Sequence, residues 1–155
     1  MTRINLVPPE ELTDQHLFAE FREIKMVAPS LRRSIVSVKN KYGESWEPVL
    51  LARIADKFTL NAGHVTFFYN KGAFLKKRFE LLRTELEKRE YNFNRDATFD
   101  ELGVFEWLGK LWNNDYTPTP AEIEISQNRI TERIYEKPQF YKYYGKPYIK
   151  SNSAY

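Results

Sequence analysis

The side chains best suited to acid–base chemistry lie close together near the start of the chain. His16, Glu20 and Glu23 are spaced at i, i+4 and i+7, so in a helix they share one face. The apolar positions of the same stretch fall on a different side, so we expect the three polar side chains to point to solvent or into a cleft. An ordinary charged helix surface has the same spacing, and the pattern alone leaves both interpretations open.

A second group of candidate residues is cationic. Arg129, Arg133 and Lys137 follow one another at every fourth position, which places them along one ridge of a helix. A ridge of this kind can bind consecutive phosphates of a nucleic acid, and each such contact adds to the salt dependence of binding. A solvated helix edge gives the same pattern, so the spacing does not decide between the two.

The end of the chain interleaves aromatic rings with lysines in "FYKYYGKPY", which includes Tyr141 and Lys142. Such rings can stack on bases or wedge into a duplex while the lysines bind the phosphate backbone. The alternative is that the rings cover the core and only the lysines reach solvent. In either case we expect residues 138–155 to form an aromatic and basic tail packed on the rest of the chain.

The composition excludes several other kinds of chemistry. The 155 residues include no cysteine, which excludes disulfides, thiol catalysis and cysteine-ligated metals. With two histidines, no glycine-rich phosphate loop, no Ser-His-Asp pattern and no carboxylate array with metal spacing, we expect neither a metal nor a cofactor. The first 20 residues lack the apolar centre of a signal peptide, and no apolar run could span a membrane. We therefore expect a soluble, intracellular, non-secreted monomer.

The charges are distributed unevenly along the chain, although the formal net charge is only +3. Residues 22–41 and 137–155 are strongly basic, whereas residues 91–128 are mostly acidic. This segregation predicts one cationic face and one acidic face, which is typical of a protein that binds a polyanion.

The elements that must position these groups are helices. Periodicity and end signals predict an all-α fold, a single compact domain of residues 1–155 with three main helices and long irregular connections. We find no β-hairpin signal. The first helix has Thr13 as its N-cap and is interrupted at Pro29, with resumption to about Val38. The other predicted elements are a short helix at Val49–Ala55, a long helix from near Gly63 to Arg89, one helical turn in "FEWLGKLW", and a third helix from "TPTP" to Pro138.

Six short segments resemble one family in the same order. They are "MTRINL", "DQH", "EFRE", "AGHVTFFY", "SQNR" and "YKYYGK". Together they are similar to the phage-type pyrimidine-dimer DNA glycosylase/AP lyase, the family of ultraviolet-damage endonuclease V. The likeness covers roughly residues 2–25, 61–90 and 115–148, whereas residues 39–60 and 91–114 match poorly and are longer here.

The resemblance implies a three-helix fold without metal or cofactor, and a nucleophile at the start of the chain. The nucleophile would be the α-amine of Thr2, exposed once Met1 is removed, and the catalytic carboxylate would be Glu23. The family has an arginine where this chain has Met26, so we expect Lys25 to serve in its place as a less rigid phosphate ligand. The residues that the resemblance assigns to phosphate binding and site organisation are Arg3, Gln15, His16, Arg22, Arg129 and Arg133.

The implied function is repair of double-stranded DNA that contains pyrimidine dimers. The enzyme would cleave the N-glycosidic bond of the 5′ pyrimidine through an imine with the Thr2 amine, and then cut the strand by β-elimination. Two alternatives are a non-catalytic damaged-DNA-binding protein that uses the same basic face, and a scaffold whose tail docks a protein. The expected catalytic residues are Thr2 and Glu23, and the expected DNA-binding residues are Arg3, Gln15, His16, Arg22, Lys25, Arg129, Arg133, Lys137, Tyr141 and Lys142.

Overall fold

The computed structural model describes residues 3–148 and confirms the all-α prediction. The three predicted helical regions are all helical, and short helices connect them. The α-helices are α1 (Asp14–Glu23), α2 (Val27–Tyr42), α3 (Trp46–Ala52), α4 (His64–Phe67), α5 (Gly72–Lys88), α6 (Val104–Leu108) and α7 (Pro120–Glu136). Turns of 3-10 helix span Pro9–Glu11, Ile24–Met26, Gly43–Ser45 and Lys110–Trp112, and the strands are β1 (Lys142–Tyr143) and β2 (Lys146–Pro147).

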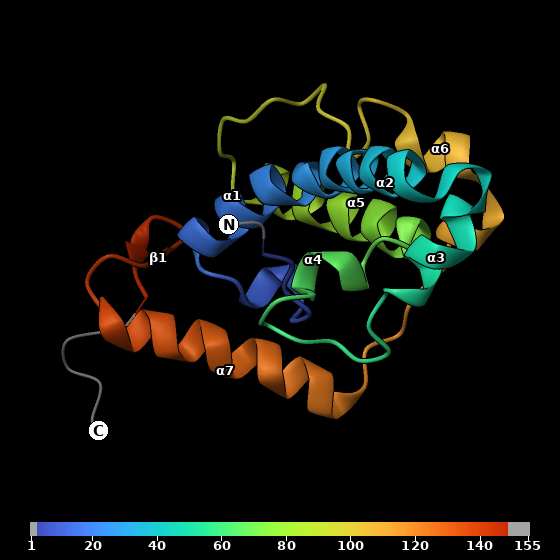
Figure 1. Ribbon diagram of the computed structural model, residues 1–155. Coiled ribbons are helices and arrows are strands. Elements are labelled where there is room, and N and C mark those ends of the chain that lie inside the picture. The colour runs from blue at the N-terminus through green and yellow to red at the C-terminus, as the bar shows by residue number, and fades with distance from the viewer. Residues whose placement is uncertain (1–2, 149–155) are drawn as a thin grey trace.

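The helices lie on both sides of the N-terminal segment, residues 3–7. Helices α1 and α2 run beside α5, whereas α7 lies apart, with α4 between α7 and the pair α2 and α5 (Figure 1). The N-terminal segment is hydrogen-bonded to residues of α1, α4, α5 and α7. The start of the described chain is therefore held from several sides rather than frayed.

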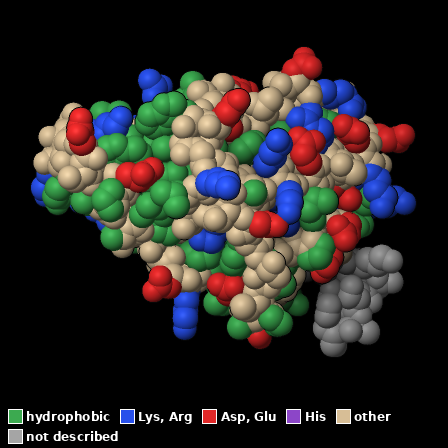
Figure 2. Space-filling view, turned by 90° about the vertical axis from the view of Figure 1, so that its right-hand side faces the viewer, with side chains coloured by type: hydrophobic (Ala, Val, Ile, Leu, Met, Phe, Trp, Pro, Cys, Tyr) green, Lys and Arg blue, Asp and Glu red, His purple; other side chains and the backbone are tan. Residues whose placement is uncertain are grey.

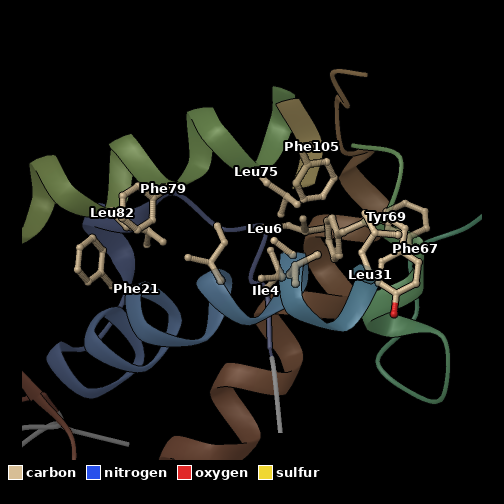
Figure 3. Packing of buried hydrophobic residues seen from close by; sticks show 14 of the residues in the cluster. Ile4, Leu6, Phe21, Leu31, Phe67, Tyr69, Leu75, Phe79, Leu82 and Phe105 are labelled. Carbon is tan, nitrogen blue, oxygen red and sulfur yellow. The ribbon is translucent and has the colours of Figure 1, made fainter. Parts of the chain in front are cut away.

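Two apolar side chains of the N-terminal segment belong to the centre of the core. Ile4 is fully buried and Leu6 is 6% exposed. They lie between a group around Phe21 and Phe79 and a second group that includes Leu31 (Figure 3). Burial of side chains of this size stabilises the fold by roughly 1.5–3 kcal/mol each, so the segment is bound tightly to the helices.

The predicted helix starts are confirmed by their caps. The Thr13 hydroxyl accepts a hydrogen bond from the N–H of His16 at 3.1 Å, which satisfies one of the free donors of α1. Helix α7 begins at Pro120 with a complete capping box, in which Thr119 and Glu122 each bind the backbone of the other. These caps fix where the two helices begin that supply half of the predicted site residues.

The predicted interruption at Pro29 is wrong. Pro29 is the third residue of α2, which runs unbroken to Tyr42 instead of ending near Val38. The first N–H groups of a helix have no partner within it, so proline removes no hydrogen bond at this position. The proline therefore lies in the first turn of a new helix, directly after the 3-10 turn at 24–26.

The single helix predicted from Gly63 to Arg89 is divided into α4 and α5, which is a second correction. Between them, the carbonyl of Asn70 accepts a hydrogen bond from the N–H of Asn114 at 3.2 Å instead of one from its own helix. Gly72, the first residue of α5, lies so close to Asn113 that a Cβ would be 2.3 Å from the amide oxygen of that side chain. The chain at 113–114 thus crosses the helix at the point where it breaks.

The structure contains one hairpin that the sequence did not indicate. Strands β1 and β2 are antiparallel, and the turn between them places Tyr144 at φ 52° and Gly145 at φ 76°. Positive φ is unfavourable for tyrosine, so the turn needs support from outside. The carboxylate of Asp14 supplies it, because its two oxygens accept the N–H groups of Tyr144 at 3.1 Å and Gly145 at 2.8 Å.

Candidate active site

An open cleft of about 360 Å³ lies between α1 and α7. Its walls come from four separate parts of the chain: the N-terminal segment, α1, α7 and the aromatic tail. Six of the residues predicted from the sequence line it, namely Arg3, His16, Glu23, Arg129, Arg133 and Tyr141.

Glu23 is the only one of the two predicted catalytic residues within residues 3–148, because Thr2 lies outside the part of the chain that the structure describes. One carboxylate oxygen, Oε1, accepts the backbone N–H of Arg3 at 2.9 Å, and Oε2 lies 3.7 Å from the guanidinium of Arg22. Burial raises the pKa of Glu23, and the Arg3 N–H and the Arg22 charge oppose that shift. The Glu23 carboxylate is therefore hydrogen-bonded to the backbone of Arg3, the residue that directly follows Thr2.

Three guanidinium groups face the cleft. Arg3 donates a hydrogen bond from Nη1 to the carbonyl of Leu60 at 2.9 Å, which fixes its side chain against the loop before α4. Burial and the charges of Arg129 and Arg133 lower the pKa of Arg3, although it stays protonated at any physiological pH. Cations held this close to one another favour an anionic ligand, and guanidinium groups bind phosphate in a bidentate manner.

His16 contributes a neutral surface to the cleft. Its ring stacks on Tyr141 with 4.7 Å between centroids and an interplanar angle of 2°, and its Nδ1 lies 2.7 Å from the Thr13 hydroxyl. Burial, with a smaller contribution from Arg133, lowers the pKa of His16 to about 4. The ring is therefore uncharged at neutral pH, so it acts by packing and hydrogen bonding and not as a cation on phosphate.

A second cavity of about 620 Å³ adjoins the cleft and shares His16 and Tyr141 with it. It brings together three further predicted residues, Gln15, Arg22 and Lys142. The side-chain oxygen of Gln15 accepts the N–H of Lys142 at 2.9 Å, so this amide ties the tail to α1.

Two predicted residues line neither cavity. The ammonium of Lys25 lies over the ring of Phe21 at 5.6 Å from its centroid. Lys137 follows the last residue of α7 and is exposed, with its N–H bonded to the carbonyl of Ile134. Their assignment to DNA binding therefore remains a prediction without support from the cleft.

Glu20 corrects one expectation about the first helix. It lies beside the cleft, as predicted for the shared face, but its carboxylate is completely buried. Arg78 of α5 donates to both oxygens at 2.7 and 2.9 Å, and the amide of Asn5 donates to Oε1 at 3.0 Å. A carboxylate with these partners supports the cleft wall and is not open to a ligand.

Sequence reasoning missed the residues that hold the N-terminal segment. The N–H of Ile4 donates to Nε2 of His64 at 2.9 Å, and the N–H of Leu6 donates to the hydroxyl of Ser126 at 2.9 Å. Arg78 donates to the carbonyl of Val7 at 2.6 Å. The one available signal was a polar residue inside a largely apolar run, as for His64 in "AGHVTFFY".

Within residues 3–148, no group of three or more His, Asp and Glu side chains is placed to bind a metal ion. No helix in the same part of the chain is both long enough and apolar enough to cross a membrane.

A helical protein whose cleft is lined by three arginines and by the Glu23 carboxylate has the features of a nucleic-acid enzyme. Residues 1–99 match the family model described as pyrimidine dimer DNA glycosylase. This match covers more than half of the chain, and the chain belongs to that family. It is accordingly a DNA repair glycosylase whose substrate is DNA with pyrimidine dimers.

Proposed function

We propose that the protein is a bifunctional glycosylase and AP lyase that uses the α-amine of Thr2 as its nucleophile. The observation that carries this proposal is the 2.9 Å hydrogen bond between the N–H of Arg3 and the Glu23 carboxylate at the edge of the cationic cleft. It ties the residue after Thr2 to the carboxylate that the chemistry requires. The family match contributes the substrate class, DNA that contains pyrimidine dimers.

The α-amine suits the first step because the pKa of an α-amino group is ordinarily about 7.7–8.0, well below the ~10.4 of lysine. A useful fraction is therefore unprotonated at neutral pH, and the positive charges of Arg3 and Arg22 favour that form while Glu23 opposes it. The amine nitrogen forms a bond to C1′ of the 5′ pyrimidine nucleotide. The glycosidic bond breaks, and its electron pair leaves with the base, which takes up a proton.

Glu23 has two tasks in this scheme. As a carboxylate it stabilises positive charge that develops at C1′, and it then accepts the proton that the amine nitrogen loses. That proton passes to the ring oxygen as the sugar opens to an imine. The Glu23 carboxylate, which has given up that proton, then takes one from C2′. The C3′–O bond breaks and the 3′ phosphate leaves with its electron pair, which cuts the strand, and water releases the sugar fragment from the amine. A raised pKa keeps Glu23 closer to the range in which it can exchange protons.

The arginines of the cleft would bind the backbone around the lesion. A cross-linked dimer weakens the local duplex, so bending it and extruding a nucleotide costs less there than in intact DNA. The extruded nucleotide in this proposal is the adenine opposite the dimer. Stacked His16 and Tyr141 provide an uncharged wall beside the cations, so the affinity comes mainly from phosphate contacts by Arg3, Arg129 and Arg133.

Borohydride trapping tests the proposal directly. Protein with a free Thr2 amine is incubated with an ultraviolet-irradiated duplex and sodium borohydride, which reduces the imine to a stable covalent adduct. We expect an adduct with irradiated DNA and none with undamaged DNA. A matched preparation with one extra residue before Thr2 should bind the same duplex and give far less adduct.

The trapping result also separates the alternatives. Specific binding to irradiated DNA without any adduct would replace the enzyme by a damage-binding protein. Failure to bind DNA at any ionic strength would favour a scaffold role for the tail. For the proposed enzyme, non-specific binding should fall steeply with salt, because each neutralised phosphate contributes about −0.9 to the slope of log affinity against log salt.

A further inference from the structure

His64 is a buried polar residue that the proposed chemistry does not use. It is the first residue of α4 and is only 4% exposed. Its ring joins two different parts of the chain. Nδ1 lies 2.7 Å from the carbonyl oxygen of Thr59, and Nε2 lies 2.9 Å from the N–H of Ile4.

These two partners determine the tautomer. A carbonyl oxygen can only accept, so Nδ1 carries the hydrogen and donates it to Thr59. Nε2 is then unprotonated and accepts the N–H of Ile4. Burial lowers the pKa of His64 to about 4, and the charge of Arg3 acts in the same direction, which agrees with a neutral ring. The rings of Phe58 and Phe68 meet the imidazole edge-on at 5.4 and 5.5 Å, so it is packed in one orientation.

The segment that His64 holds is the one that carries Thr2. Ile4 is two residues beyond Thr2, and the intervening Arg3 is fixed twice, by its N–H on Glu23 and by its guanidinium on the carbonyl of Leu60. Leu60 directly follows Thr59, so the loop before α4 binds both Arg3 and, through His64, Ile4. Two successive backbone N–H groups are thus attached to rigid parts of the protein.

We propose that His64 is a positioning residue, which sets the register of residues 3–7 by accepting the Ile4 N–H and so places the Thr2 amine for its attack on the sugar. This role rests on the proposed function of Thr2. The register matters because Ile4 and Leu6 lie in the apolar core, whereas the equally buried Asn5 between them donates to Glu20 at 3.0 Å. A shift by one residue would place the Asn5 amide among apolar side chains and take it away from Glu20. It would also move the amine by about 3.3 Å, the length of one extended residue.

Amide side chains separate the two functions of the ring. In His64→Gln the side-chain oxygen can occupy the position of Nε2 and accept the Ile4 N–H. In His64→Asn the shorter amide can replace Nδ1 as the donor to Thr59, but nothing reaches Ile4. Both variants are neutral and polar, so they differ mainly in whether the N-terminal segment is held. Thr66→Ala is the matched control, since it removes a 3.0 Å bond from the Thr66 hydroxyl to the Gly63 carbonyl in the same helix.

The experiment compares these three variants with the wild type, each confirmed as folded by circular dichroism. Single-turnover borohydride trapping on a duplex with one abasic site measures the attack by the amine, and a duplex with a non-reactive tetrahydrofuran site measures affinity. We expect trapping by His64→Asn to be roughly 10- to 100-fold slower, because small displacements of a nucleophile have effects of this size. Trapping by His64→Gln should fall less than about fivefold and Thr66→Ala should match the wild type, with all affinities within about threefold.

Amide hydrogen exchange at Ile4 tests the contact without any chemistry. Exchange should be faster in His64→Asn than in His64→Gln, because only the first variant leaves the N–H without an acceptor. Equal exchange in the two variants would overturn the positioning role even if the protein is active. Wild-type trapping by a folded His64→Asn variant would overturn its catalytic consequence. In a third outcome, the wild type itself gives no adduct while exchange at Ile4 follows the expected order. That result would contradict Thr2 as the nucleophile but would still support the hydrogen bond by which His64 holds the N-terminal segment.

Discussion

The two ends of the molecule are stabilised in different ways. At the cleft end, buried polar groups bind backbone atoms at fixed distances, as His64 and Ser126 do for the N-terminal segment. At the far end, the divergent segments 39–60 and 91–114 meet through stacked indole rings. Trp46 lies between Trp107 and Trp112, with 6.3 and 6.0 Å between centroids.

The far end also exposes part of its apolar surface. Trp107 is 63% exposed, and the ammonium of Lys39 lies over its ring at 5.1 Å from the centroid. On the side where α3 and α6 lie, hydrophobic side chains reach the surface among charges of both signs (Figure 2). The charge segregation along the sequence therefore does not produce a purely acidic face on this side.

The difference indicates which end needs exact placement. Hydrogen bonds to the backbone define position and direction, whereas aromatic pairs are favourable over a range of offsets and of centroid separations of about 4.5–7 Å. The proposed reaction, in which an amine attacks a single carbon, needs the first kind of support. We therefore expect changes at the far end to affect folding more than catalysis.

The largest expected effect is on catalysis at Glu23. Glu23→Gln keeps a carbonyl oxygen that can accept the Arg3 N–H, so the fold should persist while the charge and the proton acceptor are lost. Strand cleavage of irradiated plasmid should fall by about 10³-fold or more, with lesion binding retained. Glu106→Gln in α6 is the control at the far end and should cleave normally. A Glu23→Gln variant with more than about a tenth of wild-type activity would contradict the assignment.

The next effect concerns the support beneath the cleft. Arg78→Met leaves the Glu20 carboxylate buried without its partner, since their side chains are only 5% and 0% exposed. Loss of one partner of a buried ion pair costs about 3–5 kcal/mol, and the melting temperature should fall by roughly 10 °C. Lys77→Met on the same helix removes an exposed pair with Asp115 and should leave the melting temperature nearly unchanged. Similar melting temperatures for the two variants would show that the polar network does not stabilise the cleft end.

Much of the cleft could be predicted from the sequence because its residues lie on regular elements. The caps at Thr13 and Thr119 fix where α1 and α7 begin, so the spacing of His16 and Glu23, or of Arg129 and Arg133, determines which side chains share a face. Family likeness then connected these faces to one site. Spacing alone could not show that Glu20, on the same face, is closed off by Arg78.

Apart from the position of Pro29 in α2, the unpredicted features depend on contacts between distant segments. Helix α4 ends where residues 113–114 cross the chain, and the hairpin turn at Tyr144 is supported by Asp14 from the start of α1. Neither partner is visible in the local pattern, because periodicity reports only neighbours along the chain. The hydrogen bond between His64 and Ile4 joins residues 60 positions apart, so the local pattern does not indicate it either.

A smaller effect should appear in the dependence of stability on pH. The pKa of His64 is about 4 in the folded protein, below the value of about 6.5 in an unfolded chain. The unfolded state therefore binds more protons than the folded state between these pH values. The contribution of the neutral His64 ring to the unfolding free energy is complete above pH 6.5 and is lost as the pH falls toward 4. The shift corresponds to about 3 kcal/mol for the buried ring.

Denaturant unfolding at several pH values can measure this contribution. The difference in unfolding free energy between wild type and His64→Gln should shrink by up to about 3 kcal/mol from pH 7 to pH 4. A difference that stays constant would mean that the ring titrates normally. Proton NMR provides a second measurement, because neither His16 nor His64, each with a pKa of about 4, should titrate between pH 6 and 8.

The smallest expected effect lies at the far end and completes the comparison. Trp107→Ala removes the outer ring of the indole stack, but a side chain that is 63% exposed should contribute less than about 1 kcal/mol to stability. Cleavage of irradiated DNA should stay within about twofold of the wild type, because the ring lines neither cavity at the cleft end. A cleavage rate reduced more than tenfold in a stable Trp107→Ala variant would show that the far end takes part in the reaction. The exposed indole stack would then position DNA and not only join the two divergent segments.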